Sequence, residues 1–192
     1  MASLHFHYSA MNSGKSTSLL QVAHNYEERE MKVLVLKPKI DDRDGDFVSS
    51  RIGLKRPSIM VGPDEHLLDL FLSYNIGMHV DCILVDEAQF LSKKQVKQLS
   101  NIVDWYDVPV MCYGLLSDSN GELFEGSAAL IVLAEKKVEH KTICWCGKKA
   151  IMNMRIDENG NKVIGDQVCI GGNDRYISVC RKHWASGKPH SY

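Results

Sequence analysis

Short apolar runs alternate with segments of helical spacing through about the first 140 residues. Residues 4–8 (LHFHY) alternate in polarity, as residues of a strand do. Three later runs are almost continuously apolar, which is typical of strands covered on both faces. These runs are 33–36 (VLVL), 80–85 (VDCILV) and 108–113 (VPVMCY).

Between the apolar runs, apolar residues recur with the spacing of one helix face. Ser92 precedes one such segment and is a typical N-cap residue. Residues 41–63 are rich in charge, glycine and proline and show no period, so we expect a long surface loop there. The segments expected to be helical are 15–29, 65–74, 92–105 and 127–134.

Strands that alternate with helices predict an α/β domain with a mostly parallel sheet and helices on both faces. The ligand site of such a domain lies beyond the carboxyl ends of its strands. After residue 140 the composition changes to cysteines, a Gly–Gly pair and short strand-like pieces. We therefore expect an α/β domain at residues 1–141 and a small second module at 142–192.

Composition and charge narrow the classes of protein. The 192 residues are 44% hydrophobic and 24% charged, the balance of a soluble globular chain. The formal net charge of −1 provides no overall basic field for nucleic acid or an anionic membrane. No apolar run has the length of a membrane span, and the start MASLHFHYS lacks the pattern of a signal peptide. These features favour a cytoplasmic protein.

Residues 9–17 (SAMNSGKST) follow the phosphate-loop pattern G-x-x-x-x-G-K-[ST], with Ser9 at the first glycine position. Such a loop wraps phosphates with backbone N–H groups, and the helix that follows adds its positive end. A chance GKST at a helix start is the alternative, but a strand leads in and a helix leads out. Lys15 supplies a positive charge for the phosphates, and Ser16 is a ligand for Mg²⁺. The predicted ATP-binding residues are Ser9, Ala10, Met11, Asn12, Ser13, Gly14, Lys15 and Ser16.

An acidic pair follows the second buried run, in CILVDEAQF. Asp86 is placed to hold a metal ion through Ser16 or water. Glu87 is the adjacent carboxylate, suited to take a proton from an attacking hydroxyl or water. Acids at a strand end are common without a function, but the upstream phosphate loop favours a nucleotide site. The pair alone does not separate transfer to water from transfer to another acceptor.

Four soft or borderline metal ligands occur as two close pairs, Cys144-x-Cys146 and Cys180-x-x-His183. A Cys₃His set suits a closed tetrahedral zinc site. One such pair would be weak support, but two pairs flanking a compact module predict structural zinc. The buried character of the runs around Cys82 and Cys112 indicates that these two thiols are small core residues.

Five motifs in this order resemble the thymidine kinase family of the cytosolic, zinc-containing type. They are SAMNSGKST, the DDR of residues 41–43, VDEAQF, the two zinc pairs and IGGNDRYISVCRKH. The resemblance covers almost the whole chain. It implies a P-loop (RecA-like) fold and transfer of the γ-phosphoryl group of ATP to the 5′-hydroxyl of thymidine or deoxyuridine, giving dTMP and ADP in nucleotide salvage.

The resemblance also implies roles for individual positions. Glu87 matches the catalytic base, and residues 86–89, which include Ala88 and Gln89, match a second nucleotide-binding segment. Asp41 and Arg43 match an acidic and a basic position near the triphosphate. Substrate contacts are implied for Phe90, Gln167, Val168, Cys169, Ile170, Gly171 and Tyr176.

The Gly171–Gly172 pair suits a lid over a flat base, anchored by zinc because so small a module buries little apolar area. One departure from the family is Ser119, which stands where an aromatic residue is often found; Phe124 is near enough in sequence to replace it. The family further implies a homotetramer and feedback inhibition by dTTP.

Two other functions share the first half of the chain with a nucleoside kinase. One is an ATP-driven nucleic-acid remodelling module, which the near-neutral charge and short length disfavour. The other is a nucleotide-sensing subunit without catalysis, which Glu87 beside Asp86 disfavours. We therefore expect thymidine and ATP as ligands, and neither nucleic acid nor membrane as a partner.

Overall fold

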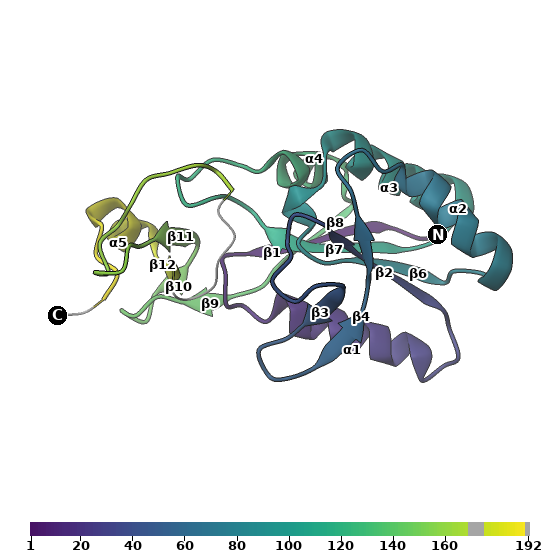
Figure 1. Cartoon of the computed structure of the whole chain (residues 1–192), viewed down its shortest axis with the longest axis horizontal. Helices are drawn as coiled ribbons and strands as arrows, with labels where there is room; N and C mark the ends of the chain where they lie inside the picture. Colours follow the sequence, from purple (N-terminus) through teal and green to yellow (C-terminus); the bar gives the residue numbers. More distant parts are fainter. Residues whose placement is uncertain (169–174, 191–192) are drawn as a thin grey trace.

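Six parallel strands form the central sheet of the protein (Figure 1). The structure is a computed structural model that describes residues 1–168 and 175–190. The spatial order of the strands is β5 (Ile59–Val61), β2 (Val33–Pro38), β6 (Cys82–Val85), β7 (Val110–Leu115), β1 (Leu4–Ser9) and β8 (Lys136–Glu139).

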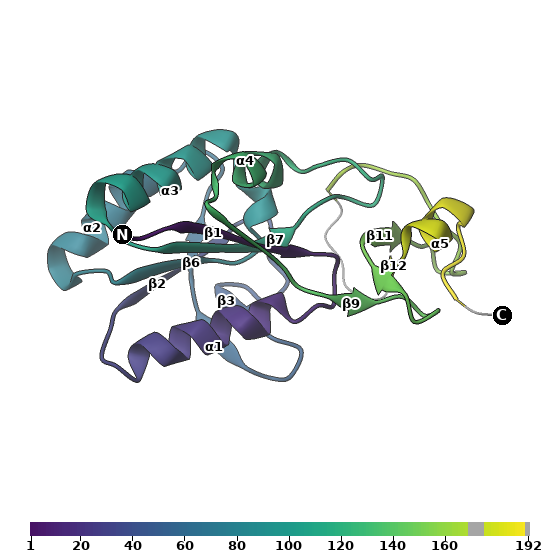
Figure 2. The same cartoon turned by 180° about the vertical axis from the view of Figure 1, so that it is seen from behind.

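Alternate residues of the strands point into two different hydrophobic layers, because side chains alternate across a sheet. On one face, Leu84 and Tyr113 pack with Leu19 of α1 (Lys15–Glu27). On the other face, Ile83 and Cys112 belong to a larger cluster that also includes residues of three helices. These helices are α2 (Leu67–Met78), α3 (Lys93–Tyr106) and α4 (Glu125–Leu133). Figures 1 and 2 show α1 on one side of the sheet and the other three helices opposite, which confirms the predicted layers.

The predicted start of α3 is confirmed in atomic detail. The Ser92 Oγ accepts a hydrogen bond from the backbone N–H of Gln95 at 3.2 Å, and the Gln95 Oε1 accepts from the Ser92 N–H at 3.1 Å. This reciprocal capping box satisfies two N–H groups that the first helical turn would otherwise leave unpaired.

The expectation of a long loop over residues 41–63 is wrong in part. Short strands β3 (Phe47–Ser49) and β4 (Lys55–Pro57) form an antiparallel pair, and β5 adds an edge strand to the central sheet. Val48 and Val61 anchor this region in the core at 1% and 2% exposure. Strands of three residues are too short to produce a periodic signal, which is why the pattern missed them.

The C-terminal module is built from small pieces. Strand β9 (Thr142–Ile143) pairs with β10 (Lys149–Ala150), β11 (Met152–Arg155) pairs with β12 (Tyr176–Val179), and α5 (Arg181–Ser186) follows. Figures 1 and 2 place these elements beyond the end of the sheet at which β1 and β7 terminate. Among the helices of the described residues, none combines the length and the apolar character needed to cross a bilayer.

Candidate active site

One cavity of about 710 Å³ lies at the carboxyl ends of the central strands. The phosphate loop forms part of its wall, residues from the segment 41–55 form a second part, and the C-terminal module contributes a third. Predicted site residues that line it are Met11, Asn12, Ser13, Gly14, Lys15, Ser16, Asp41, Arg43, Asp86, Glu87, Gln89, Phe90, Gln167, Val168 and Tyr176.

The phosphate loop turns through two left-handed residues, Asn12 at φ 64° and Gly14 at φ 78°. A conformation of this kind favours glycine, and it turns successive N–H groups toward one concave side. The Lys15 ammonium folds back over the loop, donating to the Ser9 Oγ at 2.9 Å and to the Ala10 carbonyl at 3.0 Å. The serine at the first glycine position therefore gives Lys15 a hydrogen-bond partner.

Desolvation lowers the pKa of Lys15 to about 8, although the carboxylates of Glu87 and Asp86 raise it. The cause is that a poorly hydrated ammonium is less stable than the neutral amine. An anion bound in the loop would favour the charged form. The loop thus holds a cation whose charged form a bound phosphate would stabilise.

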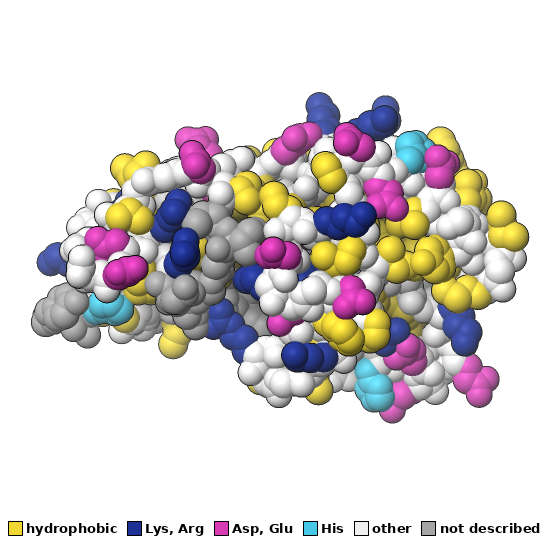
Figure 3. Space-filling view, viewed as in Figure 1, with side chains coloured by type: hydrophobic (Ala, Val, Ile, Leu, Met, Phe, Trp, Pro, Cys, Tyr) yellow, Lys and Arg dark blue, Asp and Glu magenta, His cyan; other side chains and the backbone are white. Residues whose placement is uncertain are grey.

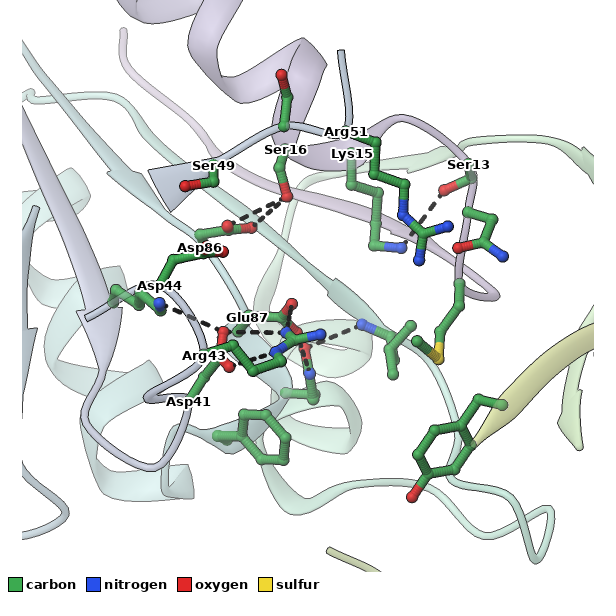
Figure 4. A pocket seen from close by; sticks show the side chains of 18 of the residues that line it. Ser13, Lys15, Ser16, Asp41, Arg43, Asp44, Ser49, Arg51, Asp86 and Glu87 are labelled. Atoms are coloured by element: carbon green, nitrogen blue, oxygen red, sulfur yellow. Dashed lines mark hydrogen bonds and ion pairs between the residues drawn. The ribbon is translucent and has the colours of Figure 1, made fainter. Parts of the chain in front are cut away.

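Ser16 and Asp86 bring two oxygen ligands together beside the loop (Figure 4). The Ser16 Oγ donates to the Asp86 Oδ2 at 3.2 Å, and Asp86 is 6% exposed at the end of β6. Burial, and then the neighbouring Glu87 carboxylate, raise the pKa of Asp86. A hydroxyl and a carboxylate in this position have the donor chemistry that Mg²⁺ prefers, so the residues fit that ion.

Arg43 links two carboxylates across the cavity (Figure 4). Its Nε donates to Asp41 Oδ1 at 2.5 Å and its Nη2 to Glu87 Oε1 at 2.7 Å. Burial raises the pKa of Asp41, but the hydrogen bonds and charge of Arg43, together with Lys37, hold it below the usual value. The hydrogen bond with Asp41 raises the pKa of Arg43, although burial opposes this effect. The predicted pair at 41 and 43 is therefore part of the site.

Both oxygens of Glu87 are held in place. While Arg43 donates to Oε1, the Gln89 Nε2 donates to Oε2 at 2.6 Å, and the Gln89 Oε1 accepts from the Leu115 N–H at 3.0 Å. Glu87 itself has a φ of 49°, a left-handed conformation that is rare outside glycine. A carboxylate fixed in this way is oriented for a single task at the cavity wall.

Two glycines create the space for the turn that follows Glu87, the 3₁₀ turn η1 (Ala88–Phe90). A Cβ on Gly114 would lie 2.7 Å from the Gln89 Oε1 and 3.0 Å from the Gln89 backbone N. A Cβ on Gly126 would lie 2.6 Å from the Ala88 carbonyl oxygen. The absence of these Cβ atoms lets β7 and α4 approach the segment that carries Glu87.

Part of the cavity wall is aromatic. The rings of Phe90 and Phe124 meet edge to face, with centroids 5.7 Å apart, and Tyr176 and Ser119 also line this part. Ser119 is 5% exposed, and its carbonyl accepts from the Trp184 Nε1 at 2.9 Å. Phe124 therefore provides an aromatic wall near Ser119. The predicted contacts Cys169, Ile170 and Gly171 lie outside the described residues.

The four predicted metal ligands converge in the C-terminal module. All four ligand atoms of Cys144, Cys146, Cys180 and His183 lie within 4.8 Å of one another. The Sγ atoms of Cys146 and Cys180 are 4.0 Å apart, and the His183 Nδ1 is 3.3 Å from the Cys144 Sγ. Two sulfurs on tetrahedral zinc are about 3.8 Å apart when each Zn–S bond is about 2.3 Å. The donor set and its spacing therefore fit zinc.

Some residues of the predicted set do not line the cavity. Ser9 and Ala10 are buried at the start of the phosphate loop, where they accept hydrogen bonds from Lys15, and Ala88 is fully buried in the core. The cavity wall also includes Lys37 and Arg51, which the motifs did not indicate. Lys37 is 2% exposed and lies 3.5 Å from the Asp41 Oδ2. The sequence signal that could have identified Lys37 was its position, since this lysine directly follows the buried apolar run 33–36.

Comparisons with known proteins agree with the geometry. The sequence model of the family described as thymidine kinase matches residues 2–184. The chain is 54% identical over 186 residues to a thymidine kinase of Idiomarina loihiensis, covering 96% of each protein. It is also 54% identical to one of Vibrio cholerae (96% and 97% covered) and 52% identical to one of Salmonella choleraesuis (96% and 91% covered).

Among solved structures, a Bacteroides Pif1 bound to ssDNA matches 72% of this chain and 38% of its own length. The TM-score is 0.39 and the identity 14%, a likeness too low to support a conclusion about this protein.

Proposed function

The chain belongs to the thymidine kinase family and is an ATP-dependent kinase, and we propose that it transfers the γ-phosphoryl group of ATP to the 5′-hydroxyl of thymidine. One observation carries this proposal: Glu87 lines the same cavity as the phosphate loop and the Phe90–Phe124 pair. A donor site, a general base and an aromatic acceptor site therefore share one cavity.

The donor half binds ATP. The N–H groups of the loop and the Lys15 ammonium hold the phosphates, and Ser16 and Asp86 would hold Mg²⁺, which neutralises phosphate charge when bound. Arg43 extends toward the same region from its position between Asp41 and Glu87. In a loose phosphoryl-transfer state, catalysis rests on positioning and charge stabilisation, and Arg43 supplies a fixed positive charge.

Glu87 is the general base. It takes the proton of the 5′-hydroxyl, the hydroxyl oxygen forms a bond to the γ-phosphorus, and the bond from that phosphorus to the β–γ bridging oxygen breaks to release ADP. The hydrogen bonds from Arg43 and Gln89 orient the carboxylate. Exclusion of water from the cavity would favour the sugar hydroxyl over hydrolysis.

The acceptor half of the cavity binds the thymine ring of the nucleoside. Phe90 packs on the thymine ring, Tyr176 and the segment 167–171 make further contacts, and deoxyuridine is accepted as well. Phe124 forms the aromatic wall of the thymine pocket next to Ser119. The module 142–192 acts as the lid of the α/β domain 1–141, and zinc on Cys144, Cys146, Cys180 and His183 gives it a fixed shape.

We further propose a cellular role, a form of regulation and an oligomeric state for the enzyme. The protein serves nucleotide salvage for DNA synthesis in the cytoplasm, is inhibited by its end product dTTP, and assembles as a homotetramer.

On the face shown in Figure 3, Lys and Arg are interspersed with Asp and Glu, so this face has no continuous basic surface for nucleic acid. Light scattering tests the assembly, since four chains of 21.6 kDa are expected in one particle.

A transfer assay with γ-labelled ATP and a panel of nucleosides tests the reaction. We expect label on thymidine and deoxyuridine and little on purine nucleosides. ATP hydrolysis that DNA stimulates, with no labelled nucleoside, would overturn the proposal. Addition of dTTP in the same assay tests feedback, and unchanged turnover at saturating dTTP would remove that part.

A further inference from the structure

Two side chains of the C-terminal module hold the backbone of one residue of the phosphate loop, Met11, at both its N–H and its carbonyl. The Asn153 Oδ1 accepts a hydrogen bond from the Met11 backbone N–H at 2.8 Å, and the Ser178 Oγ donates to the Met11 carbonyl at 2.7 Å. Asn153 and Ser178 are directly opposite each other in the β11–β12 pair. Opposite residues of an antiparallel pair point to the same face, so the pair forms a two-sided clamp on Met11.

Asn153 also reaches the acceptor side. Its Nδ2 donates to the Ser117 carbonyl at 3.3 Å, in the segment between β7 and α4 that carries Ser119 and Phe124. Asn153 is 3% exposed and lines the cavity. One buried amide therefore contacts the donor loop with its oxygen and the acceptor wall with its nitrogen.

We propose that Asn153 is a positioning residue for phosphoryl transfer, which sets the phosphate loop against the acceptor pocket, with Ser178 as its partner on Met11. The inference rests on the proposed function. Transfer requires reacting atoms within about 3–3.5 Å of each other in the correct alignment, and a misplacement of about 1 Å can reduce the rate about 10²-fold. A buried residue that touches both halves of the site controls this distance.

The contact also divides the phosphate loop by role. Because the Met11 N–H donates to Asn153, the cradle for the phosphates is left to the N–H groups of residues 12–16. The Thr142 Oγ1 donates to the next carbonyl, of Asn12, at 3.1 Å, but in an exposed position. Loss of the clamp should therefore change the alignment of the donor more than the affinity for ATP.

Asn153→Leu tests this, because the leucine side chain has the same number of heavy atoms and the same branching at Cγ as asparagine, but neither hydrogen-bonding group. We expect kcat for thymidine to fall tenfold or more, with the Kd of a non-hydrolysable ATP analogue changed less than threefold and zinc content unchanged. Turnover within twofold of wild type would overturn the proposal. The proposal would also be overturned if ATP affinity fell as much as turnover, because Asn153 would then only support the ATP site.

Ser178→Ala removes one hydroxyl and keeps the test open if Asn153→Leu fails to fold. We expect a fall in kcat of about threefold or more. In the double variant, we expect a smaller fall than the product of the two single effects, since both residues act on Met11. A fully multiplicative result would contradict a shared action.

Asn161→Leu is the matched control, because Asn161 is exposed in the same module and bonds only locally, to Asp157. Its turnover should stay within twofold of wild type, and a fall as large as that of Asn153→Leu would overturn the proposal.

Hydrogen exchange gives a readout that needs no nucleoside. The peptide containing the Met11 amide should exchange faster in Asn153→Leu than in wild type, and unchanged exchange would contradict the clamp. If wild-type protein phosphorylates no thymidine, the proposed function fails, while hydrogen exchange still decides whether Asn153 holds Met11.

Discussion

The α/β domain and the C-terminal module are stabilised in different ways. The domain has hydrophobic layers on both faces of a six-stranded sheet. Among the described residues, the buried cluster of the module consists of Cys144, Ala150, Met154, Val179 and Cys180, two of which belong to the predicted zinc set, with the partly buried Met152, Ile156, Ile177 and Trp184 packed against it. A core of that size contributes little burial energy, so we expect the module to depend on metal binding and on its contacts with the domain.

This difference separates the two halves of the reaction. Asp86 and Glu87 follow strand β6 of the central sheet directly, and Lys15 begins helix α1, which the loop of residues 10–14 joins to β1, so the packed sheet fixes their positions. The acceptor side combines Phe90 and Phe124 of the domain with Tyr176 of the module, so we expect its module part to depend on metal binding. Changes in the domain should therefore affect chemistry or global stability, whereas changes at the metal site should affect the acceptor side.

The largest effect is expected from Glu87→Gln, on the domain side. Glutamine keeps the size of the side chain but cannot accept the proton, so kcat should fall about 10²–10⁴-fold, the usual contribution of a general base. Binding of an ATP analogue, measured by calorimetry, should change only a few-fold. Turnover equal to wild type would remove Glu87 as the base.

Loss of a metal ligand should weaken the module and leave the domain folded. In Cys144→Ala we expect zinc content to fall from about one per chain toward zero and the KM for thymidine to rise about tenfold or more, because metal binding supplies much of the folding energy of a small metal-bound unit. ATP affinity should fall less. Metal analysis and steady-state kinetics measure these effects.

Cys82→Ala is the matched control, since Cys82 is equally buried but lies in β6 of the central sheet. It should retain zinc and a normal KM for thymidine. If Cys144→Ala also retained zinc and full turnover, the ligand assignment would be wrong.

Gly114→Ala tests the close approach under Glu87. The new Cβ would meet the backbone and side chain of Gln89, so we expect a loss of about 1–3 kcal/mol in the free energy of unfolding, as for other overpacked sites. Urea denaturation measures it, and kcat should fall because Gln89 orients Glu87. Gly77→Ala is the control, because its Cβ position in α2 has no described atom within 4 Å apart from its chain neighbours and the backbone of its own helix, and alanine favours a helix. Destabilisation of the same size there would argue against the steric explanation.

The smallest effect is expected from His7 in β1. Burial, and then the charges of His140 and His5, lower the pKa of His7 to about 4. Between pH 6.5 and 4 the unfolded chain therefore binds a proton that the folded chain does not, so stability should decrease as pH falls through this range. His7→Phe keeps a ring against Tyr113 and should make the decrease in Tm from pH 7 to 5 shallower. An unchanged pH dependence would contradict this assignment.

The sequence by itself determined the features that depend on neighbours along the chain. The alternation of buried runs and helical segments predicted the parallel sheet and its two helical layers. The pattern of residues 9–16 predicted the phosphate loop, because consecutive residues form this loop and a local sequence pattern is therefore enough to specify it. The capping residue Ser92 was read correctly for the same reason, whereas the short strands between residues 47 and 61 carried too few residues for a pattern.

Only the tertiary structure decided which distant residues meet. The module's four metal ligands were predicted from two local pairs, but their convergence within 4.8 Å is a property of the folded chain. The contact between Asn153 and Met11, and the link of Arg43 to Glu87, join residues far apart in the sequence and had no local signal. These contacts depend on how the module and the loops dock on the sheet, and docking is set by the packing of surfaces whose residues are far apart in the sequence.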